Sequence, residues 1–357
     1  MIDSLAARGD VTACAAIGKR LTSPDAAVRR AAIDALGRVG DTWCVPPLVG
    51  ALDRTKDASE RRALESALID LRGGAQTERA IAAALKKSAG ATRASLVTAL
   101  ARRQGPAADA LLLFEASQSD AAAAKAALRA LSKTAAGKEV TPLLEVLTRT
   151  PDAEVRAEAE SATAQALARM DDTARRSALV RQALGWAQSV ESQTAVLELL
   201  PGCGDAAALA ALIVATGDAD SRVRDAAVRA LADWPDASAW DALAAIYRQP
   251  ATESVRGLAL RGLARLANEE NAHPSGRLIA RYALLLAGAH NDADYRLILG
   301  ALGGDPQPEA LGLVLPLLDN ANVRAEAEAA VKKIAEAVKA QHPKEAQEAL
   351  NRLQPKQ

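Results

Sequence analysis

One short signature recurs along the whole chain at an almost constant interval. In its clearest copies, Val followed by Arg opens a helix rich in Ala and Leu. The clear copies begin at Val28, Val155, Val223, Val255 and Val323, and weaker ones at Glu60, Thr92, Ala123, Ser192 and Asp294. Successive copies are 32, 32, 31, 32, 37, 31, 32, 39 and 29 residues apart. A period of this length is typical of helical or mixed repeats that stack into a solenoid.

The best-preserved copy predicts that each unit is a pair of helices. Residues 11–21 carry apolar side chains at helical spacing, and a Ser-Pro-Asp turn interrupts them. Asp25 is suited to cap the second helix, in which apolar residues recur at helical spacing over 28–39. We expect Gly40 to end that helix in the left-handed conformation. The next helix is expected over 42–52.

The composition agrees with a stack of thin layers. Half of the residues are apolar, but aromatic residues make up only 2% and charged residues 25%. Alanine lets neighbouring helices approach closely, and a solenoid needs no large central core because each repeat packs only on its neighbours. No run of alternating β-branched residues predicts a strand. We therefore predict an all-α protein, an α-solenoid of about ten helix pairs.

The same pattern predicts one continuous domain over residues 1–357. Residues 1–9 align with the end of a second helix, so we interpret them as the remnant of a preceding repeat. Residues 341–357 are rich in charge, and we interpret them as a C-terminal cap. The two long intervals, around 170–190 and 268–276, are either tolerated loop variation or functional insertions. The first is expected to lengthen a helix over 173–187, and the second is polar and turn-rich.

This order of features resembles the HEAT-repeat superfamily, in particular the short bacterial repeats of the phycobilisome-lyase type. The resemblance rests on a helix, a short Pro/Asp turn, Val-Arg, an Ala-rich helix and Gly-Asp, and it covers essentially the whole chain. The family often has an Asp five residues before the Val that bonds along the stack. Of the clear copies only Asp218 fits, since Ser23, Thr150 and Pro250 occupy that place in others. We therefore expect stacking to depend mainly on apolar contacts.

No arrangement of residues in the sequence predicts a catalytic, metal or cofactor site. The histidines lie in different repeats and form no HExxH motif, and the cysteines form no CxxC pair. No Gly-rich phosphate loop and no GxSxG motif is present. We predict no catalytic, metal or cofactor residues, and reduced cysteines packed as small apolar groups. The residues concerned are His273, His290, His342, Cys14, Cys44 and Cys203.

Charge is balanced overall but not along the chain. The totals are 44 basic and 44 acidic residues, yet residues 1–150 hold 22 basic and 16 acidic ones. A basic N-terminal third is compatible with nucleic acid, but its most basic stretch, 54–103, contains no aromatic residue for base stacking. A solvated helix face or an acidic protein partner explains the excess as well. The candidate contact residues here are Arg61, Arg62, Arg102 and Arg103.

Aromatic residues gather late in the chain. Trp240 and Tyr247 are seven residues apart and therefore share a helix face. Core packing is the ordinary role of such residues, but a partly exposed pair would suit a binding hot spot. We hypothesise that the inner surface of repeats six to eight binds a protein or peptide segment there. Among the second-helix residues, we expect Arg222, Asp225 and Arg229 to be exposed and available for recognition.

The predicted function is that of a non-catalytic protein-binding scaffold or adaptor, which we expect to be monomeric and part of a larger bacterial protein. Its partner is a protein or peptide, with no cofactor. Two alternatives remain open at this point: a phycobilisome-lyase-like enzyme or chaperone that acts on a modified protein, and nucleic-acid binding through the basic N-terminal third. The chain opens with neither a signal sequence nor an apolar span, which favours the cytoplasm, or the periplasm if further residues precede residue 1.

Overall fold

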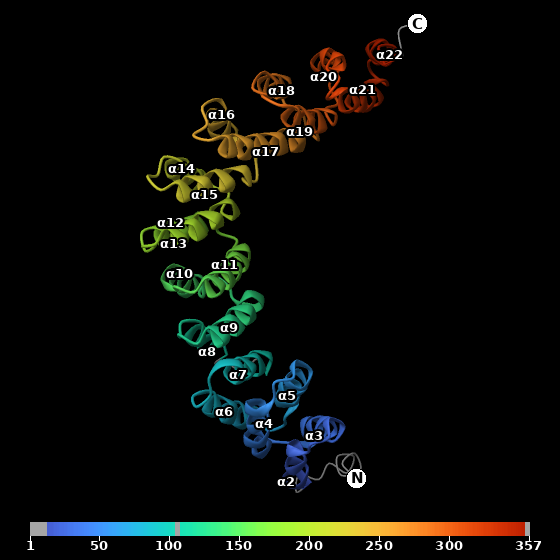
Figure 1. Cartoon of the computed structure of the whole chain (residues 1–357). Helices are drawn as coiled ribbons and strands as arrows, with labels where there is room; N and C mark the ends of the chain where they lie inside the picture. Colours follow the sequence, from blue (N-terminus) through green and yellow to red (C-terminus); the bar gives the residue numbers. More distant parts are fainter. Residues whose placement is uncertain (1–12, 104–107, 354–357) are drawn as a thin grey trace. The chain divides into compact units, whose positions relative to one another are not determined.

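The computed structural model describes residues 13–103 and 108–353, and over these residues the chain is built from helices alone (Figure 1). They form ten helix–turn–helix repeats followed by one last helix, and no strand occurs among them. The prediction of an all-α solenoid is confirmed.

In each repeat a first helix, often extended by a 3-10 turn, is followed by a second helix. The first helices are α2 (Ala13–Gly18) with η1 (Lys19–Thr22), η2 (Thr42–Cys44) with α4 (Val45–Arg54), α6 (Gly74–Leu85), α8 (Ala108–Ala116), α10 (Val140–Arg149), α12 (Thr173–Leu184), α14 (Ala206–Ala215), η4 (Ala237–Ala239) with α16 (Trp240–Arg248), α18 (Leu278–Ala287), and α20 (Glu309–Val314) with η5 (Leu315–Asp319). The remaining 3-10 turn, η3 (Leu200–Gly202), directly continues the second helix that ends at Leu199.

The second helices carry the Val-Arg signature or its weaker copies. They are α3 (Ala26–Val39), α5 (Ala58–Asp70), α7 (Gly90–Arg103), α9 (Ala121–Thr134), α11 (Ala153–Ala168), α13 (Val190–Leu199), α15 (Ser221–Ala232), α17 (Glu253–Glu270), α19 (Asp292–Leu302) and α21 (Arg324–Val338). The final helix is α22 (Pro343–Asn351).

The repeats gather into two compact units, residues 1–196 and 197–357, with the boundary inside α13. Unit 1 holds the first five repeats and most of the sixth, and unit 2 holds the others and α22. The prediction of a single domain over 1–357 stays a prediction. Residues 1–9, interpreted above as the remnant of a repeat, lie outside the described residues.

Capping residues explain where the second helices begin. The Asp25 carboxylate accepts hydrogen bonds from the backbone N–H groups of Ala27 and Val28 at 2.8 and 3.4 Å, as the sequence predicts. Such a cap satisfies donors that have no partner inside the helix. The same role is taken by Asp57, Asp120, Asp152 and Asp220.

Small residues let the second helices of neighbouring repeats approach closely. Ala32 and Leu36 on α3 are fully buried against α5. A Cβ atom on Gly37 would lie only 3.0 Å from the Cα atom of Ala67. This close approach explains how an alanine-rich chain with so few aromatic side chains fills its interior.

Gly40 ends α3, but not in the left-handed conformation that we predicted. Its φ and ψ are −72° and 160°, which is extended backbone. Glycine is required there for space, because a Cβ atom would lie 2.4 Å from the carbonyl oxygen of Leu36 and 2.9 Å from Sγ of Cys44. The next helix begins at Thr42 as predicted and extends to Arg54, beyond the predicted residue 52.

The two long intervals mainly lengthen second helices. In the first, α11 has 16 residues, while α12 ends at Leu184, short of the predicted residue 187. In the second, α17 has 18 residues and includes 268–270, which we expected to lie in a loop. Insertions can therefore continue a regular helix as well as enlarge a loop.

The charged C-terminal segment forms α22, which packs on α21 and buries Ala346 and Ala349 while Lys344 and Glu345 face solvent. Its role as a cap stays a prediction. Across the two described ranges, no helix is both long enough and apolar enough to span a membrane.

Candidate protein-binding edge

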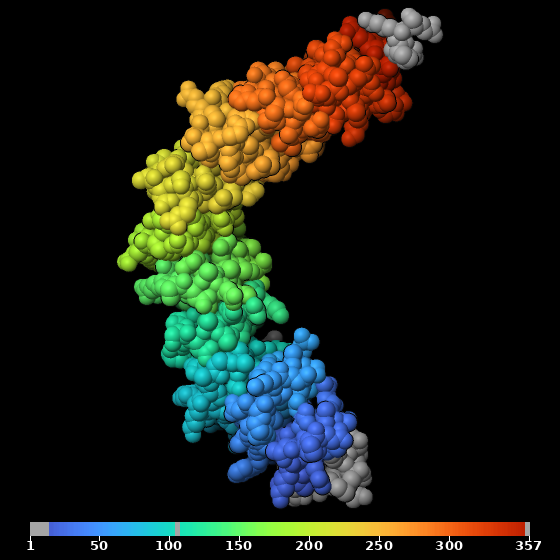
Figure 2. All heavy atoms as spheres, in the orientation of Figure 1, coloured from blue at the N-terminus to red at the C-terminus, as the bar shows by residue number. Residues whose placement is uncertain are grey.

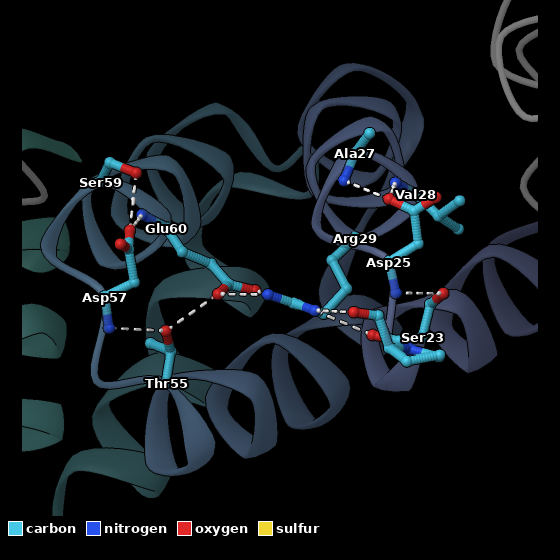
Figure 3. Close-up of polar contacts among 10 residues, drawn as sticks. Ser23, Asp25, Ala27, Val28, Arg29, Thr55, Asp57, Ser59 and Glu60 are labelled. Carbon is cyan, nitrogen blue, oxygen red and sulfur yellow. Dashed lines mark hydrogen bonds and ion pairs between the residues drawn. The ribbon is translucent and has the colours of Figure 1, made fainter.

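The Arg of the Val-Arg signature fixes the turn inside its own repeat. Arg29 Nη1 donates to the carbonyl oxygen of Ser23, six residues earlier, at 2.9 Å (Figure 3). Because this carbonyl lies after the end of the first helix, the bond ties the two helices of a repeat together. The same bond, to the carbonyl six residues earlier, is made by Arg61, Arg156 and Arg224, each at 2.8 Å.

Polar bonds also join successive repeats. Arg29 Nε donates to Glu60 Oε1 at 2.7 Å, and Thr55 Oγ1 donates to Glu60 Oε2 at 3.0 Å (Figure 3). The bond from Arg29 holds the pKa of Glu60 below its ordinary value. Glu115 takes a similar pair of bonds from Arg93, at 2.7 and 2.9 Å. The expectation of mainly apolar stacking is thus incomplete, since carboxylates at other positions replace the missing Asp.

A second set of arginines caps the helix of the preceding repeat. Arg103 Nη1 donates to the carbonyl oxygens of Leu68, Ile69 and Leu71, at 3.1, 2.6 and 2.9 Å, at the C-terminal end of α5. A cation at a helix C-terminus is also favoured by the helix dipole. Arg169 and Arg265 bond in the same way to the ends of α9 and α15.

These contacts divide the four basic residues proposed from the sequence into two structural and two exposed ones. Arg61 and Arg103 are half-buried and bond to backbone carbonyls of the fold, while Arg62 and Arg102 are exposed. The sequence could not distinguish them, because both roles place an arginine on a second helix.

Trp240 and Tyr247 are buried, so our expectation of a partly exposed pair is wrong. They are 5% and 4% exposed. The Arg281 guanidinium lies over the Trp240 ring at 4.6 Å, and the Tyr247 hydroxyl donates to the carbonyl oxygen of Leu285 at 3.1 Å. Burial raises the pKa of Tyr247 to about 12. Both rings fill the space between α16 and its neighbours, and the burial of their large apolar area stabilises the fold.

The second-helix residues expected to be available for recognition lie on α15. Arg222 and Arg229 are exposed and Asp225 is half-buried. Arg222 is engaged locally, with Nη2 3.2 Å from Asp220 Oδ2. They form a charged face of this helix.

The hollows of unit 1 lie elsewhere. We call the row of turns that join the first and second helices of repeats one to six the turn edge. In Figure 1, α8, α10 and α12 lie one above another beside this edge, and Figure 2 shows the same layers as space-filling atoms. Three hollows open on the edge, between repeats one and two, four and five, and five and six, with volumes of about 490, 760 and 930 Å³.

The hollow between repeats four and five has apolar walls with Glu145, Arg149 and Asp152 at its border, and an exposed aromatic ring lies at its side. Leu113 and Phe114 of α8 form one wall, and Pro142, Val146 and Pro151 form the other. Phe114, the chain's single phenylalanine, is 56% exposed. An aromatic ring this exposed beside an apolar hollow is unusual for a residue type that packs in cores.

The neighbouring hollow adds cationic and aromatic groups. Arg149 and Pro151 line both hollows, and Arg156 and the half-buried Trp186 line the second. The Arg149 side chain is 74% exposed, with Nη1 3.4 Å from Glu145 Oε2. We call the two adjoining hollows the edge groove, defined by Phe114, Val146, Arg149, Pro151 and Trp186.

We did not predict the edge groove from the sequence. Its one signal is the run Leu111–Phe114, in which four apolar residues follow one another and so cannot all face the core of a helix that has a neighbour on one side. The missing information is the distance between turns of successive repeats, which depends on packing.

The chain offers no metal centre within the described residues, where no three His, Cys, Asp or Glu side chains come together. His273 and His290 are exposed, and His342 lies 3.5 Å from Glu345. The three cysteines are buried and form no disulfide in the part of the chain that the structure describes, as expected for packed thiols.

Burial, with Cys14 beside it, raises the pKa of the Cys44 thiol to about 12. An ordinary cysteine has a pKa of about 8.5, so at pH 8 Cys44 should react with iodoacetamide about a thousandfold more slowly than in the urea-unfolded chain. Mass spectrometry of the alkylated peptides measures both rates. Equal rates in the folded and unfolded chain would contradict the burial of this thiol.

Comparison with known proteins agrees with this architecture. The family model described as HEAT repeats matches residues 1–69 and 177–264. The solved structure of the karyopherin Kap121p bound to the SUMO protease Ulp1p is similar, with a TM-score of 0.62 at 14% identity over 96% of this chain and 43% of that chain. Kap121p bound to Ste12p gives a TM-score of 0.61 at 15% identity, over 96% of this chain and 43% of that one. A search of curated protein sequences gives no match.

These findings define the class as an all-α solenoid built from helix pairs. Within this class, residues 1–69 and 177–264 match the HEAT-repeat family model. The chain spans less than half the length of the Kap121p structures that it matches, and at this level of identity the likeness concerns the fold.

Proposed function

We propose that this protein is a non-catalytic scaffold that holds an extended segment of a partner protein in the edge groove of unit 1. The observation that carries the proposal is Phe114, which stays 56% exposed beside an apolar hollow of about 760 Å³. Exposing an apolar ring to water costs free energy that a bound partner would recover.

The chemistry of the groove suits a protein segment. Its volume lies in the range of pockets that enclose a few side chains. Aromatic and arginine side chains dominate binding hot spots, and the groove has Phe114, Trp186 and Arg149 within adjacent hollows. Val146 and the two prolines give it rigid apolar walls, which lose little conformational entropy on binding.

The fold also supports a role in protein binding. HEAT-repeat solenoids are typical protein-binding scaffolds, and the similar Kap121p structures are bound to proteins, Ste12p and Ulp1p. The alternative binding surfaces are the second-helix faces proposed from the sequence, with Arg62 and Arg102 in unit 1, and Arg222, Asp225 and Arg229 in unit 2.

Selection from a random peptide library on the full chain tests the proposal. Selected peptides should carry a large apolar residue, and Phe114→Ala should weaken their binding by about 2 kcal/mol, or roughly thirtyfold in Kd. Fluorescence anisotropy with the selected peptides, labelled with a dye, measures this change.

The matched control is Trp43→Ala. Trp43 is 83% exposed in unit 1 and lines a different hollow, with Pro47, so it removes an exposed aromatic ring away from the edge groove. Peptides that lose affinity equally with both variants, or that respond only to Arg62→Ala and Arg102→Ala, would show that the edge groove is not the binding site.

A further inference from the structure

The edge groove contains hydrogen-bond donors that the fold does not use. Trp186 and Gln188 line its second hollow, where Trp186 is half-buried and Gln188 is exposed. Among the residues that the structure describes, neither the Trp186 indole N–H nor the Gln188 side-chain amide forms a hydrogen bond. An occupant that removes water from this hollow must offer acceptors to these donors, because a buried donor without a partner is costly.

The charged side chains that line the edge groove have both signs. Arg149 Nη1 lies 3.4 Å from Glu145 Oε2, and Arg156 Nη2 donates to the carbonyl oxygen of Thr150 at 2.8 Å. The Asp152 carboxylate caps the start of α11. An occupant rich in charge of either sign would meet like charges in this groove, whereas an uncharged one would meet none. The balance of charge therefore favours an uncharged segment.

The two hollows follow one another along the turn edge at the spacing of successive repeats. They share Arg149, Thr150 and Pro151, and the first helices beside them, α8, α10 and α12, pack in this order (Figure 1). Packed helices lie about 8–10 Å apart, so equivalent points of the two hollows are separated by about this distance. A segment that fills both hollows must present side chains on one face at that interval.

A polyproline II helix has this interval. It rises about 3.1 Å per residue with about three residues per turn, so every third side chain returns to the same face about 9 Å further on. A β-strand instead places the side chains of one face about 6.6 Å apart. An α-helix reaches about 10.5 Å at every seventh residue, but its carbonyl oxygens are bonded within the helix. The carbonyl oxygens of polyproline II have no internal bonds and can accept from Trp186 and Gln188.

We propose that the edge groove binds an uncharged, proline-rich segment in the polyproline II conformation. One aliphatic side chain of the segment lies beside Phe114 and Val146, and the side chain three residues further on lies against Trp186. The carbonyl oxygens between them accept from the Trp186 indole N–H and the Gln188 amide. Such a segment already has its bound conformation and loses little entropy when it binds. This inference rests on the proposed function and names the class of occupant for the same groove.

The test measures fluorescence anisotropy with the full chain and three dye-labelled peptides of twelve residues. The first repeats Leu-Pro-Pro, which places its leucines on one face of a polyproline II helix. The second repeats Leu-Pro-Pro-Pro, which keeps the conformation but turns successive leucines away from one face. The third repeats Leu-Ala-Ala, which keeps the sequence spacing but not the conformation. We expect the first peptide to bind at least about tenfold more tightly than either of the others.

Two variants test the donors of the groove. Trp186→Phe keeps an aromatic ring and removes the N–H group, so it should weaken binding of the Leu-Pro-Pro peptide about three- to tenfold, as expected for one hydrogen bond. Gln188→Ala, at an exposed position, should also weaken it. The matched control Trp43→Phe changes an indole that is 83% exposed and lines a different hollow, and it should leave the binding unchanged.

The proposal is overturned if the Leu-Pro-Pro peptide fails to bind, if the three peptides bind equally, or if neither Trp186→Phe nor Gln188→Ala weakens binding more than Trp43→Phe. The selected library peptides separate this result from the proposed function. If they contain no proline but still depend on Phe114, the groove binds a partner and only the polyproline II occupant is excluded. If neither they nor the Leu-Pro-Pro peptide responds to Phe114→Ala, both proposals fail.

Discussion

Replacing Arg256 with methionine is expected to lower the free energy of unfolding by about 3–5 kcal/mol. Arg256 is 1% exposed, and its Nη2 atom donates to Asp294 Oδ2 in the next repeat at 2.6 Å. Asp294 is itself only 8% exposed, so the variant would leave a buried carboxylate without its cation. Its remaining bond is from the His290 backbone N–H at 2.9 Å, which cannot replace a full charge.

Two further variants distinguish the effect of losing the ion pair from the effect of losing side-chain volume. Arg256→Met combined with Asp294→Leu removes both charges and should recover most of the loss, because a buried pair is often replaceable by apolar residues. Arg324→Met breaks an exposed pair with Glu328, in which the arginine side chain is 55% exposed, and should cost no more than about 0.5 kcal/mol. Urea unfolding followed by circular dichroism measures all three. Equal losses for Arg256→Met and Arg324→Met would contradict a buried ion pair.

The repeated signature predicts the fold well because the same local interactions form each repeat. Asp25 at the helix start and the apolar spacing of α3 depend only on neighbours in sequence, and the structure confirms both. Gly40 was predicted to be left-handed because helix ends often are. The space there is limited by the Leu36 carbonyl oxygen, by Cys44 and by the Leu71 side chain, 31 positions later, and no local pattern reveals this last contact.

The candidate site was harder to predict because it depends on contacts between repeats. Arg61, Arg62, Arg102 and Arg103 have similar sequence surroundings, but only packing shows that two of them bond to backbone carbonyls. Trp240 on α16 is buried with the Arg281 guanidinium over its ring, whereas Phe114 on α8 is exposed beside a hollow. The rarity of aromatic residues therefore marks positions that matter without showing whether they are core or surface.

Replacing Gly262 with alanine is expected to lower the free energy of unfolding by about 1–3 kcal/mol, the usual cost of overpacking a core. Gly262 lies in α17 where this helix crosses α15. An added Cβ atom would lie 2.7 Å from Cα of Ala232 and 3.1 Å from Cδ1 of Leu243. Since the first contact is with backbone, no change of rotamer relieves it, and α15 and α17 must move apart.

The same helix contains a control glycine, whose replacement by alanine is expected to raise the free energy of unfolding. A Cβ atom on Gly257 would meet only the flexible end of Arg261, at 3.8 Å. Gly257→Ala should therefore stabilise unit 2 by about 0.5–1 kcal/mol, because alanine loses less backbone entropy than glycine in a helix. Urea unfolding of the two variants compares them directly. If Gly262→Ala also stabilises the protein, α15 and α17 are not in close contact at this position. The packing of small residues would then not explain how the second helices of neighbouring repeats stack.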